Sequence, residues 1–114
     1  MAIKNAQIID TFLGREDHGI MTFSIHVRTD SYDISVGGYA LDRYDKDRDT
    51  RVFTAKGLEA ISEILKVVGV DKWEDLPRKY IRIVDDGWGK PIDEIGNFMD
   101  DKWFNLREFF AKEG

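Results

Sequence analysis

The chain has 114 residues and contains no cysteine. This absence excludes disulfide bonds, thiolate nucleophiles and zinc sites with thiolate ligands. Proteins that need no disulfide are typical of reducing compartments. We therefore expect the cytoplasm as the setting of this protein.

Long apolar runs are also missing. No segment approaches the ~18 apolar residues that span a membrane, and the first residues lack the pattern of a signal peptide. We therefore expect no association with a membrane. The length predicts one domain over residues 1–114, because a chain of this size fills one ordinary domain.

The chain has no excess of basic residues. Its net charge of −5 argues against binding of DNA or RNA through a broad basic face, since phosphate backbones are recognised by clustered Lys and Arg. A small ligand that carries phosphate stays open, because a few arginines can dominate the field of one pocket.

Complete catalytic motifs are absent as well. No serine lies in a nucleophile elbow, and no phosphate-binding loop of the Gly-x-x-x-x-Gly-Lys type occurs. The paired carboxylates Asp85-Asp86 and Asp100-Asp101 lie in predicted turns, where such pairs are usually solvated rather than poised for proton transfer. We expect no enzyme activity, no catalytic residue and no cofactor.

Metal ligands are scarce. His18 and His26 are the only histidines, and a metal triad would require both to converge with a carboxylate. The alternating charges of residues 45–49 resemble a calcium loop, but Thr50 and Lys56 occupy the positions of its glycine and glutamate. We therefore expect two exposed histidines, a mixed-charge loop and no metal site.

Alternating apolar residues dominate the first third of the chain. Met21, Phe23, Ile25 and Val27 alternate with polar residues, which predicts a strand with one buried face. Similar patterns separated by short turns indicate an antiparallel meander. The predicted strands cover residues 2–13, 21–27, 32–36, 79–84 and 91–95.

One long helix is expected after a solvated loop over residues 42–51. Thr54 is a suitable N-cap and Gly69 a suitable C-terminal stop. The apolar stripe at helical spacing comprises Ala55, Leu58, Ile61, Leu65 and Val68. Capping patterns predict one helical turn near residues 71–74 and a short helix over residues 105–112. The expected fold class is α+β, with an antiparallel sheet of about five strands, one main helix and a short C-terminal helix.

The first candidate site is the glycine pair Gly37 and Gly38, which Tyr39 follows. Glycine inside a strand costs conformational entropy and packs no side chain. Two in a row therefore indicate a bulge, a bend or the close approach of a ligand. Exposed backbone N–H groups at such a bend would suit a small anion.

The second candidate site is the segment Phe53-Thr54-Ala55-Lys56-Gly57, in which the expected helix starts near Thr54 and Ala55. The free N–H groups and the positive dipole end of a helix favour an anion. Gly57 in the first turn would reduce steric bulk there. Ordinary helix capping explains Thr54 equally well.

The third candidate site combines the aromatic residues Trp88, Trp103 and Phe104 with Asn97. A flat base stacks on such rings, and an asparagine side chain bonds the edge of a base. Aromatic residues near the ends of strands and helices are also frequent in hydrophobic cores, which is the alternative here.

The fourth candidate set contains the arginines Arg28, Arg82 and Arg107. The guanidinium group matches phosphate with two parallel hydrogen bonds, so these residues are candidate ligands for a phosphate group. Taken alone, each of them is more typical of an ordinary surface residue.

A series of short motifs runs across nearly the whole chain. In chain order, the motifs are Ala6-x-Ile8, Thr11-x-Leu13-Gly14-x-Glu16-Asp17-His18-Gly19-Ile20, Gly37-Gly38-Tyr39-x-Leu41-Asp42, Thr54-Ala55-x-Gly57-Leu58-x-x-Ile61, Trp73-Glu74-Asp75-Leu76, Ile95-Gly96-Asn97 and Trp103-Phe104. Their combined order is fairly specific, whereas each motif alone is not. This order resembles a family of small bacteriophage and prophage proteins, and the pattern is similar to the first-described Thoeris anti-defence family of phage proteins.

The resemblance implies a nucleotide sponge, which binds and holds an immune signalling nucleotide without cleaving it. The implied ligands are cyclic ADP-ribose isomers and, for some members, cyclic oligonucleotides. The implied assembly is a homo-oligomer with ligand sites at subunit interfaces. The implied pockets are one that comprises Gly37, Gly38, Thr54 and Ala55, and another near Asn97, Trp103 and Arg107. Many members carry a richer glycine run where this chain has residues 33–36, so the ligand of the first pocket stays open.

We therefore expect a phage anti-defence protein that acts in the host cytoplasm by sequestering a small cyclic nucleotide. The alternative is an acidic phage inhibitor that binds a host defence protein through the carboxylates around Asp85 and Asp100. A structural part of a virion is neither supported nor excluded by the sequence.

Overall fold

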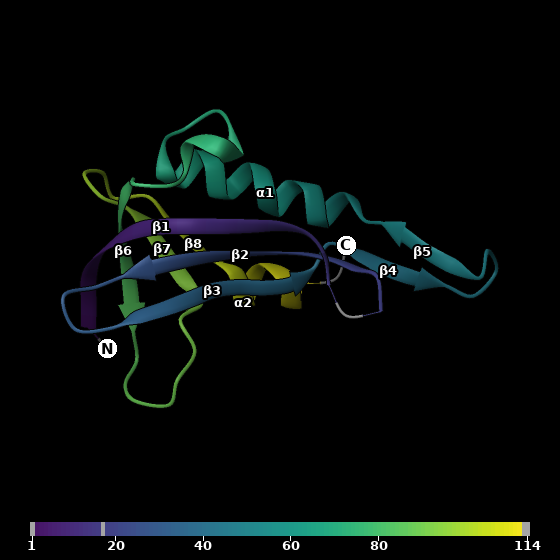
Figure 1. Ribbon diagram of the computed structural model, residues 1–114, viewed down its shortest axis with the longest axis horizontal. Helices are drawn as coiled ribbons and strands as arrows, with labels where there is room; N and C mark the ends of the chain where they lie inside the picture. The colour runs from purple at the N-terminus through teal and green to yellow at the C-terminus, as the bar shows by residue number, and fades with distance from the viewer. Residues whose placement is uncertain (1, 17, 113–114) are drawn as a thin grey trace.

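The computed structural model describes residues 2–16 and 18–112; Met1, Asp17 and residues 113–114 lie outside the described part. A six-stranded antiparallel sheet has the strand order β3-β2-β1-β6-β7-β8 (Figure 1). Its strands are β1 (Ala2–Glu16), β2 (Ile20–Arg28), β3 (Asp33–Ala40), β6 (Tyr80–Asp85), β7 (Glu94–Asn97) and β8 (Trp103–Asn105). The α+β class is confirmed, whereas the expected strand number is too low, because a separate two-stranded hairpin adds to these six.

The long strand β1 lies near the middle of the sheet. Its residues 2–7 pair with β6 and its residues 7–16 pair with β2. A bulge at Ile9 interrupts the pairing with β2. Ala6 and Ile8 of β1 are buried in the core, whereas Ile3, Phe12 and Leu13 of the same strand are exposed.

The alternation expected in β2 is confirmed. Phe23, Ile25 and Val27 are fully buried, and Met21 at the start of the strand is partly buried. These side chains belong to a core that also contains Ile64 of the main helix. Burial of one face of β2 therefore joins the sheet to the helix.

The main helix α1 (Ala55–Val68) begins and ends where the capping residues predict. The side chain of Thr54 accepts a hydrogen bond from the Gly57 N–H at 2.9 Å. Gly69 follows the helix with a φ of 92°, a left-handed conformation that favours glycine.

The buried face of α1 differs from the predicted stripe. Ala55 and Leu58 are exposed, so their assignment to the buried face is wrong. A Cβ atom on Gly57 would lie 2.6 Å from the carbonyl oxygen of Leu41, which shows how closely the two backbones approach. This close approach places Gly57, rather than Ala55 or Leu58, on the buried face of the helix. The residues that are buried are Gly57, Ala60, Ile64, Val67 and Val68.

The segment predicted as a solvated loop over residues 42–51 is a hairpin, so this prediction is wrong. Strands β4 (Asp42–Asp45) and β5 (Thr50–Phe53) pair in antiparallel fashion and extend from one end of the molecule (Figure 1). The buried carboxylate of Asp42 pairs with Arg51 at 2.7 Å. The Arg51 guanidinium lowers the pKa of Asp42. Pairing of opposite charges across the two strands thus stabilises a segment that has few apolar residues.

The C-terminal part of the chain contains short elements. The 3₁₀ turn η1 (Trp73–Asp75) confirms the predicted helical turn. Strand β7 begins later than predicted, and the short strand β8 was not predicted. The helix α2 (Leu106–Ala111) begins after Asn105, whose side chain accepts a hydrogen bond from the Glu108 N–H at 3.0 Å. This cap confirms the predicted start of the C-terminal helix.

Candidate functional site

An open cavity of about 430 Å³ lies at the N-terminal end of α1, and we call it the α1 cavity. Both of its charged lining residues are basic, although the chain has 22 acidic and 17 basic residues. Three further cavities are lined by residues of both signs. The α1 cavity therefore offers the surroundings best suited to an anion. Its lining residues are Ala40, Arg43, Phe53, Thr54, Ala55, Lys56 and Phe110.

Lys56 is the most informative of these residues. Its Nζ atom is buried and has no hydrogen-bond partner among the described residues. The ammonium group lies 5.5 Å from the centroid of the Phe109 ring, which compensates only in part for lost hydration. A buried ammonium without an acceptor is costly, and an anion in the adjoining cavity would supply one.

Arg43 provides the second positive charge of the α1 cavity. It lies on β4 of the hairpin, is exposed, and forms no ion pair with another described residue. Its guanidinium group is therefore free to bind a phosphate or carboxylate of a ligand.

The start of α1 contributes backbone donors to the α1 cavity. Thr54 accepts from the Gly57 N–H and donates to the carbonyl oxygen of Leu41 at 3.2 Å, so its hydroxyl is engaged in capping. The N–H groups of Ala55 and Lys56 precede the first hydrogen bond of the helix. They present the positive end of the helix dipole to the cavity that these residues line.

The two glycines of β3 lie outside the α1 cavity. Gly37 and Gly38 have φ values of 116° and 85°, at a bulge where the register between β2 and β3 shifts. A Cβ atom on Gly37 would lie 2.8 Å from the ring of Phe23, whereas the space around Gly38 is open. Gly37 and Gly38 do not line the α1 cavity with Thr54 and Ala55, and their grouping in one pocket of an assembly stays a prediction.

Tyr39 does not line the α1 cavity, and its side chain contacts other residues of the protein. Its hydroxyl donates to Asp93 Oδ1 at 2.9 Å, and its ring stacks on Phe110 at a centroid distance of 4.6 Å. Burial, with the Asp93 hydrogen bond, raises the pKa of Tyr39. The other oxygen of Asp93 pairs with Arg107 at 2.8 Å. The candidate residues Tyr39 and Arg107 therefore meet at Asp93.

Three further candidates, Arg82, Asn97 and Trp103, lie close together near the end of β7. Arg82 donates to the carbonyl oxygens of Asn97 and Asp100, both at 2.8 Å, and lies 4.6 Å from the Trp103 ring centroid. The Asn97 side chain donates to Val67 O at 2.9 Å and accepts from two N–H groups in the turn that follows. These contacts are internal, so Arg82 and Asn97 connect α1, β6 and the turn after β7.

Arg28 lies apart from all the other candidates. It forms an exposed ion pair with Asp33 at 2.8 Å, across the turn between β2 and β3. The hydrogen bond between them raises the pKa of Arg28 and lowers that of Asp33. This geometry is that of an ordinary surface pair.

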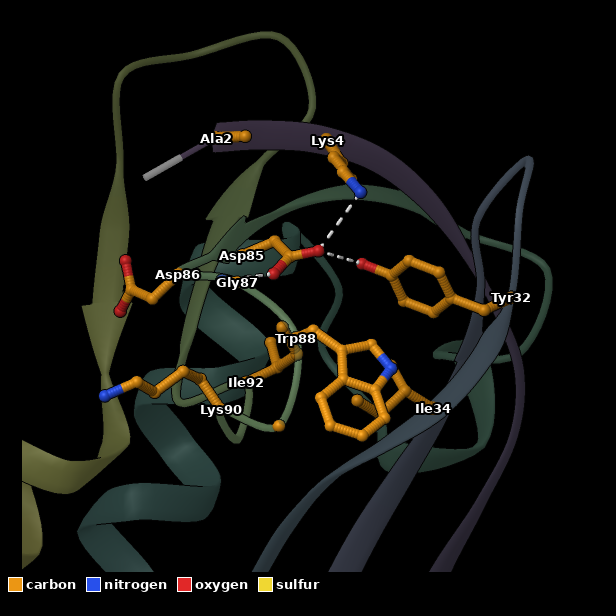
Figure 2. Close-up of a pocket in the computed structure, with 11 residues that line it drawn as sticks. Ala2, Lys4, Tyr32, Ile34, Asp85, Asp86, Gly87, Trp88, Lys90 and Ile92 are labelled. Atoms are coloured by element: carbon orange, nitrogen blue, oxygen red, sulfur yellow. Dashed lines mark hydrogen bonds and ion pairs between the residues drawn. The ribbon is translucent and has the colours of Figure 1, made fainter.

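Figure 2 shows another cavity, of about 620 Å³, which we call the Trp88 cleft. Trp88 is fully exposed on the loop after β6. Tyr32 and Ile34 line the same cleft from the other side. The side chain of Lys90 points away from Trp88 in this view. The cleft thus combines exposed aromatic surface with charges of both signs.

A partly buried cluster of polar contacts at one wall of the Trp88 cleft is centred on Asp85. Its Oδ2 atom accepts from the Tyr32 hydroxyl at 2.6 Å and contacts Lys4 Nζ at 3.1 Å, and its Oδ1 atom accepts from the Gly87 N–H at 2.8 Å (Figure 2). These hydrogen bonds, that of Tyr32 foremost, lower the pKa of Asp85 to about 2. A carboxylate held in this way is a poor general base at neutral pH, and it joins β1, β6 and the turn before β3 instead.

Phe53 and Lys56, which flank Thr54 and Ala55 in the second candidate segment, also line the α1 cavity. Sequence reasoning missed Arg43 and Phe110. These two residues reach the cavity through the packing of the hairpin and of α2, which no local sequence pattern predicts.

The described residues contain no group of three or more His, Asp or Glu arranged to hold a metal ion. Within residues 2–16 and 18–112, no helix is both long and apolar enough to cross a membrane. Comparison of the chain with protein-family models, with curated proteins and with solved structures found no match.

Proposed function

We propose that this protein binds a small cyclic signalling nucleotide in the α1 cavity and holds it without cleaving it, in the cytoplasm of a phage-infected host. The observation that carries the proposal is the buried Nζ of Lys56, which has no hydrogen-bond partner among the described residues and borders this cavity. A phosphate oxygen would accept its hydrogen bond and neutralise its charge.

The remaining groups of the cavity suit the other parts of a nucleotide. Arg43 and the N–H groups at the start of α1 are donors for phosphate oxygens. Phe53 is 70% exposed and offers a flat apolar surface for a base. Stacking of this kind contributes about 1–3 kcal/mol per base.

Binding without cleavage follows from the chemistry of the lining. The described residues of the α1 cavity include no carboxylate, imidazole or thiol that would serve as a general base or nucleophile. Its cations would stabilise a bound phosphate in its ground state as well as in any transition state. Such uniform stabilisation increases the affinity for the ligand and does not accelerate a chemical step.

A homo-oligomer is part of the proposal. Phe53 and Leu58, which are 70% and 74% exposed, lie at the open end of α1. Large exposed apolar side chains beside a cavity are typical of surfaces that contact another protein. A second copy of the chain on this surface would remove water from the cavity and strengthen its electrostatic interactions.

The test is calorimetry of the wild-type protein against cyclic ADP-ribose isomers and cyclic di- and trinucleotides, followed by heating of the complex. We expect saturable binding of at least one compound and its release with unchanged mass. Recovery of a hydrolysed nucleotide would indicate an enzyme. Absence of binding by the whole panel, with salt-sensitive capture of a host protein, would favour the acidic inhibitor instead.

A further inference from the structure

We infer that Tyr39, held by Asp93, is a positioning residue that fixes Phe110 as a wall of the α1 cavity. The bulge at Gly37 and Gly38 serves to place Tyr39 for this role. The inference rests on the proposed function of the cavity and assigns a role to residues that do not themselves line it.

The first step is the placement of Tyr39 by the bulge. The register between β2 and β3 shifts between Thr22 and Ser24, so β3 has one extra residue opposite this part of β2. Such a bulge bends and twists its strand, and it changes the direction of the side chain that follows. Gly37 and Gly38 have positive φ values in this bulge, a conformation that glycine adopts readily because it has no Cβ atom.

The second step is the contact between Tyr39 and Phe110. Their rings are parallel to within 4°, and their centroids are 4.6 Å apart. Phe110 belongs to α2, which has six residues. A helix of this length has little stability of its own, so its position depends on tertiary contacts. The ring of Tyr39 is thus a main support for the cavity wall that Phe110 forms.

The third step is the anchoring of Tyr39 by Asp93. The side chain of Asp93 accepts the Tyr39 hydroxyl at 2.9 Å and pairs with Arg107 at 2.8 Å, and its backbone oxygen accepts from the Leu106 N–H at 2.7 Å. One residue therefore connects the end of β3 to the first two residues of α2. A hydrogen bond to a charged carboxylate is among the stronger ones in proteins.

The experiment compares Tyr39→Phe with Tyr32→Phe. Both variants lose one hydroxyl that donates to an aspartate, but Tyr32 and Asp85 belong to the Trp88 cleft. Two quantities are measured for each variant: the Kd of a cyclic ADP-ribose isomer by calorimetry, and the hydrogen exchange of the amides of residues 106–111. The second measurement needs no ligand.

For Tyr39→Phe we expect a Kd about tenfold higher than wild type and faster exchange in α2, because a charged hydrogen bond is lost. Tyr32→Phe should change neither. Tyr39→Phe should add little to the effect of Asp93→Ala, since that variant has already lost the contact. If the Tyr39 hydroxyl contributed only to overall stability, Tyr39→Phe and Tyr32→Phe would lower that stability equally.

Each result decides a different claim. Faster exchange in α2 with an unchanged Kd would overturn the positioning role and leave nucleotide binding intact. Unchanged exchange in α2 would overturn the anchoring itself. If the wild type does not bind the probe, the proposed function fails for that ligand, and the exchange measurement alone still decides whether Tyr39 holds α2.

Discussion

The ring of Phe23 occupies the space that a side chain at Gly37 would need. A Cβ atom at position 37 would lie 2.8 Å from Phe23 Cε2 and 3.0 Å from the Phe23 carbonyl oxygen. Phe23 is fully buried in the core. The glycine pair is therefore a packing and backbone requirement of the β2–β3 bulge.

Gly37→Ala should destabilise the protein more than Gly38→Ala. Both substitutions place a side chain at a positive φ, which costs about 1–3 kcal/mol. Only the first also creates a clash in the core, which adds about 1–3 kcal/mol. Urea denaturation of the two variants measures the difference. Equal losses of stability would contradict the packing role of Gly37.

Gly57→Ala should also destabilise the protein, although alanine is the better helix former by about 1 kcal/mol. The added Cβ atom would lie 2.6 Å from the carbonyl oxygen of Leu41, and backbone on both sides limits relaxation. We expect a net loss of about 1–3 kcal/mol. Ser62→Ala, at an exposed position of the same helix, is the control and should be neutral or slightly stabilising. A gain in stability for Gly57→Ala would disprove the close approach of α1 to Leu41.

The lowered pKa of Asp85 predicts that the stability of the protein depends on pH. Its pKa is about 2 in the folded protein and has its ordinary value of 3.8 without these contacts, so the folded state favours the ionised form. The stabilisation is fully present above about pH 4 and is lost as the pH falls toward about 2. The difference in stability between wild type and Asp85→Asn should therefore narrow over this range. Carbon NMR of the Asp85 carboxyl should also show a higher pKa in Tyr32→Phe, and an unchanged pKa would contradict the assigned cause.

Asn97→Ala tests whether Asn97 is structural. Its side chain makes three hydrogen bonds, to Val67 O and from the N–H groups of Met99 and Asp100. Their loss should cost about 2–4 kcal/mol. Asn5→Ala, at an exposed position of β1, should have little effect. The comparison is made by thermal denaturation, and similar melting temperatures for both variants would return Asn97 to the candidates for ligand binding.

Local patterns predicted the parts of the fold that local physics determines. The alternation that includes Phe23 and Ile25 identified β2 and its buried face. Capping chemistry identified the residues Thr54 and Gly69 at the ends of α1. The face that α1 buries was not predictable from its own sequence. Gly57 packs against the backbone of Leu41, which lies outside the helix and its apolar pattern.

The difference between local patterns and contacts of distant residues also explains which parts of the hairpin and of the α1 cavity were predictable. The pairing of β4 with β5 relies on the ion pair between Asp42 and Arg51, and a count of charges alone indicated a loop. Thr54 was correctly placed at a helix start that lines a cavity. Lys56 Nζ is buried beside the ring of Phe109, which lies far along the chain in α2, so the pattern of neighbouring residues does not predict this burial.

The most direct test of the central claim is the affinity of Lys56→Gln for the cyclic nucleotide that the wild type binds, measured by calorimetry beside Lys66→Gln. Both lysines lie on α1, but Lys66 is exposed and pairs with Glu63 at 3.4 Å. We expect Lys56→Gln to raise the Kd by about ten- to a hundredfold, because a hydrogen bond from a desolvated cation to phosphate is lost. Lys66→Gln should leave the Kd unchanged. Equal affinities of both variants and the wild type would contradict the assignment of the α1 cavity as the nucleotide site.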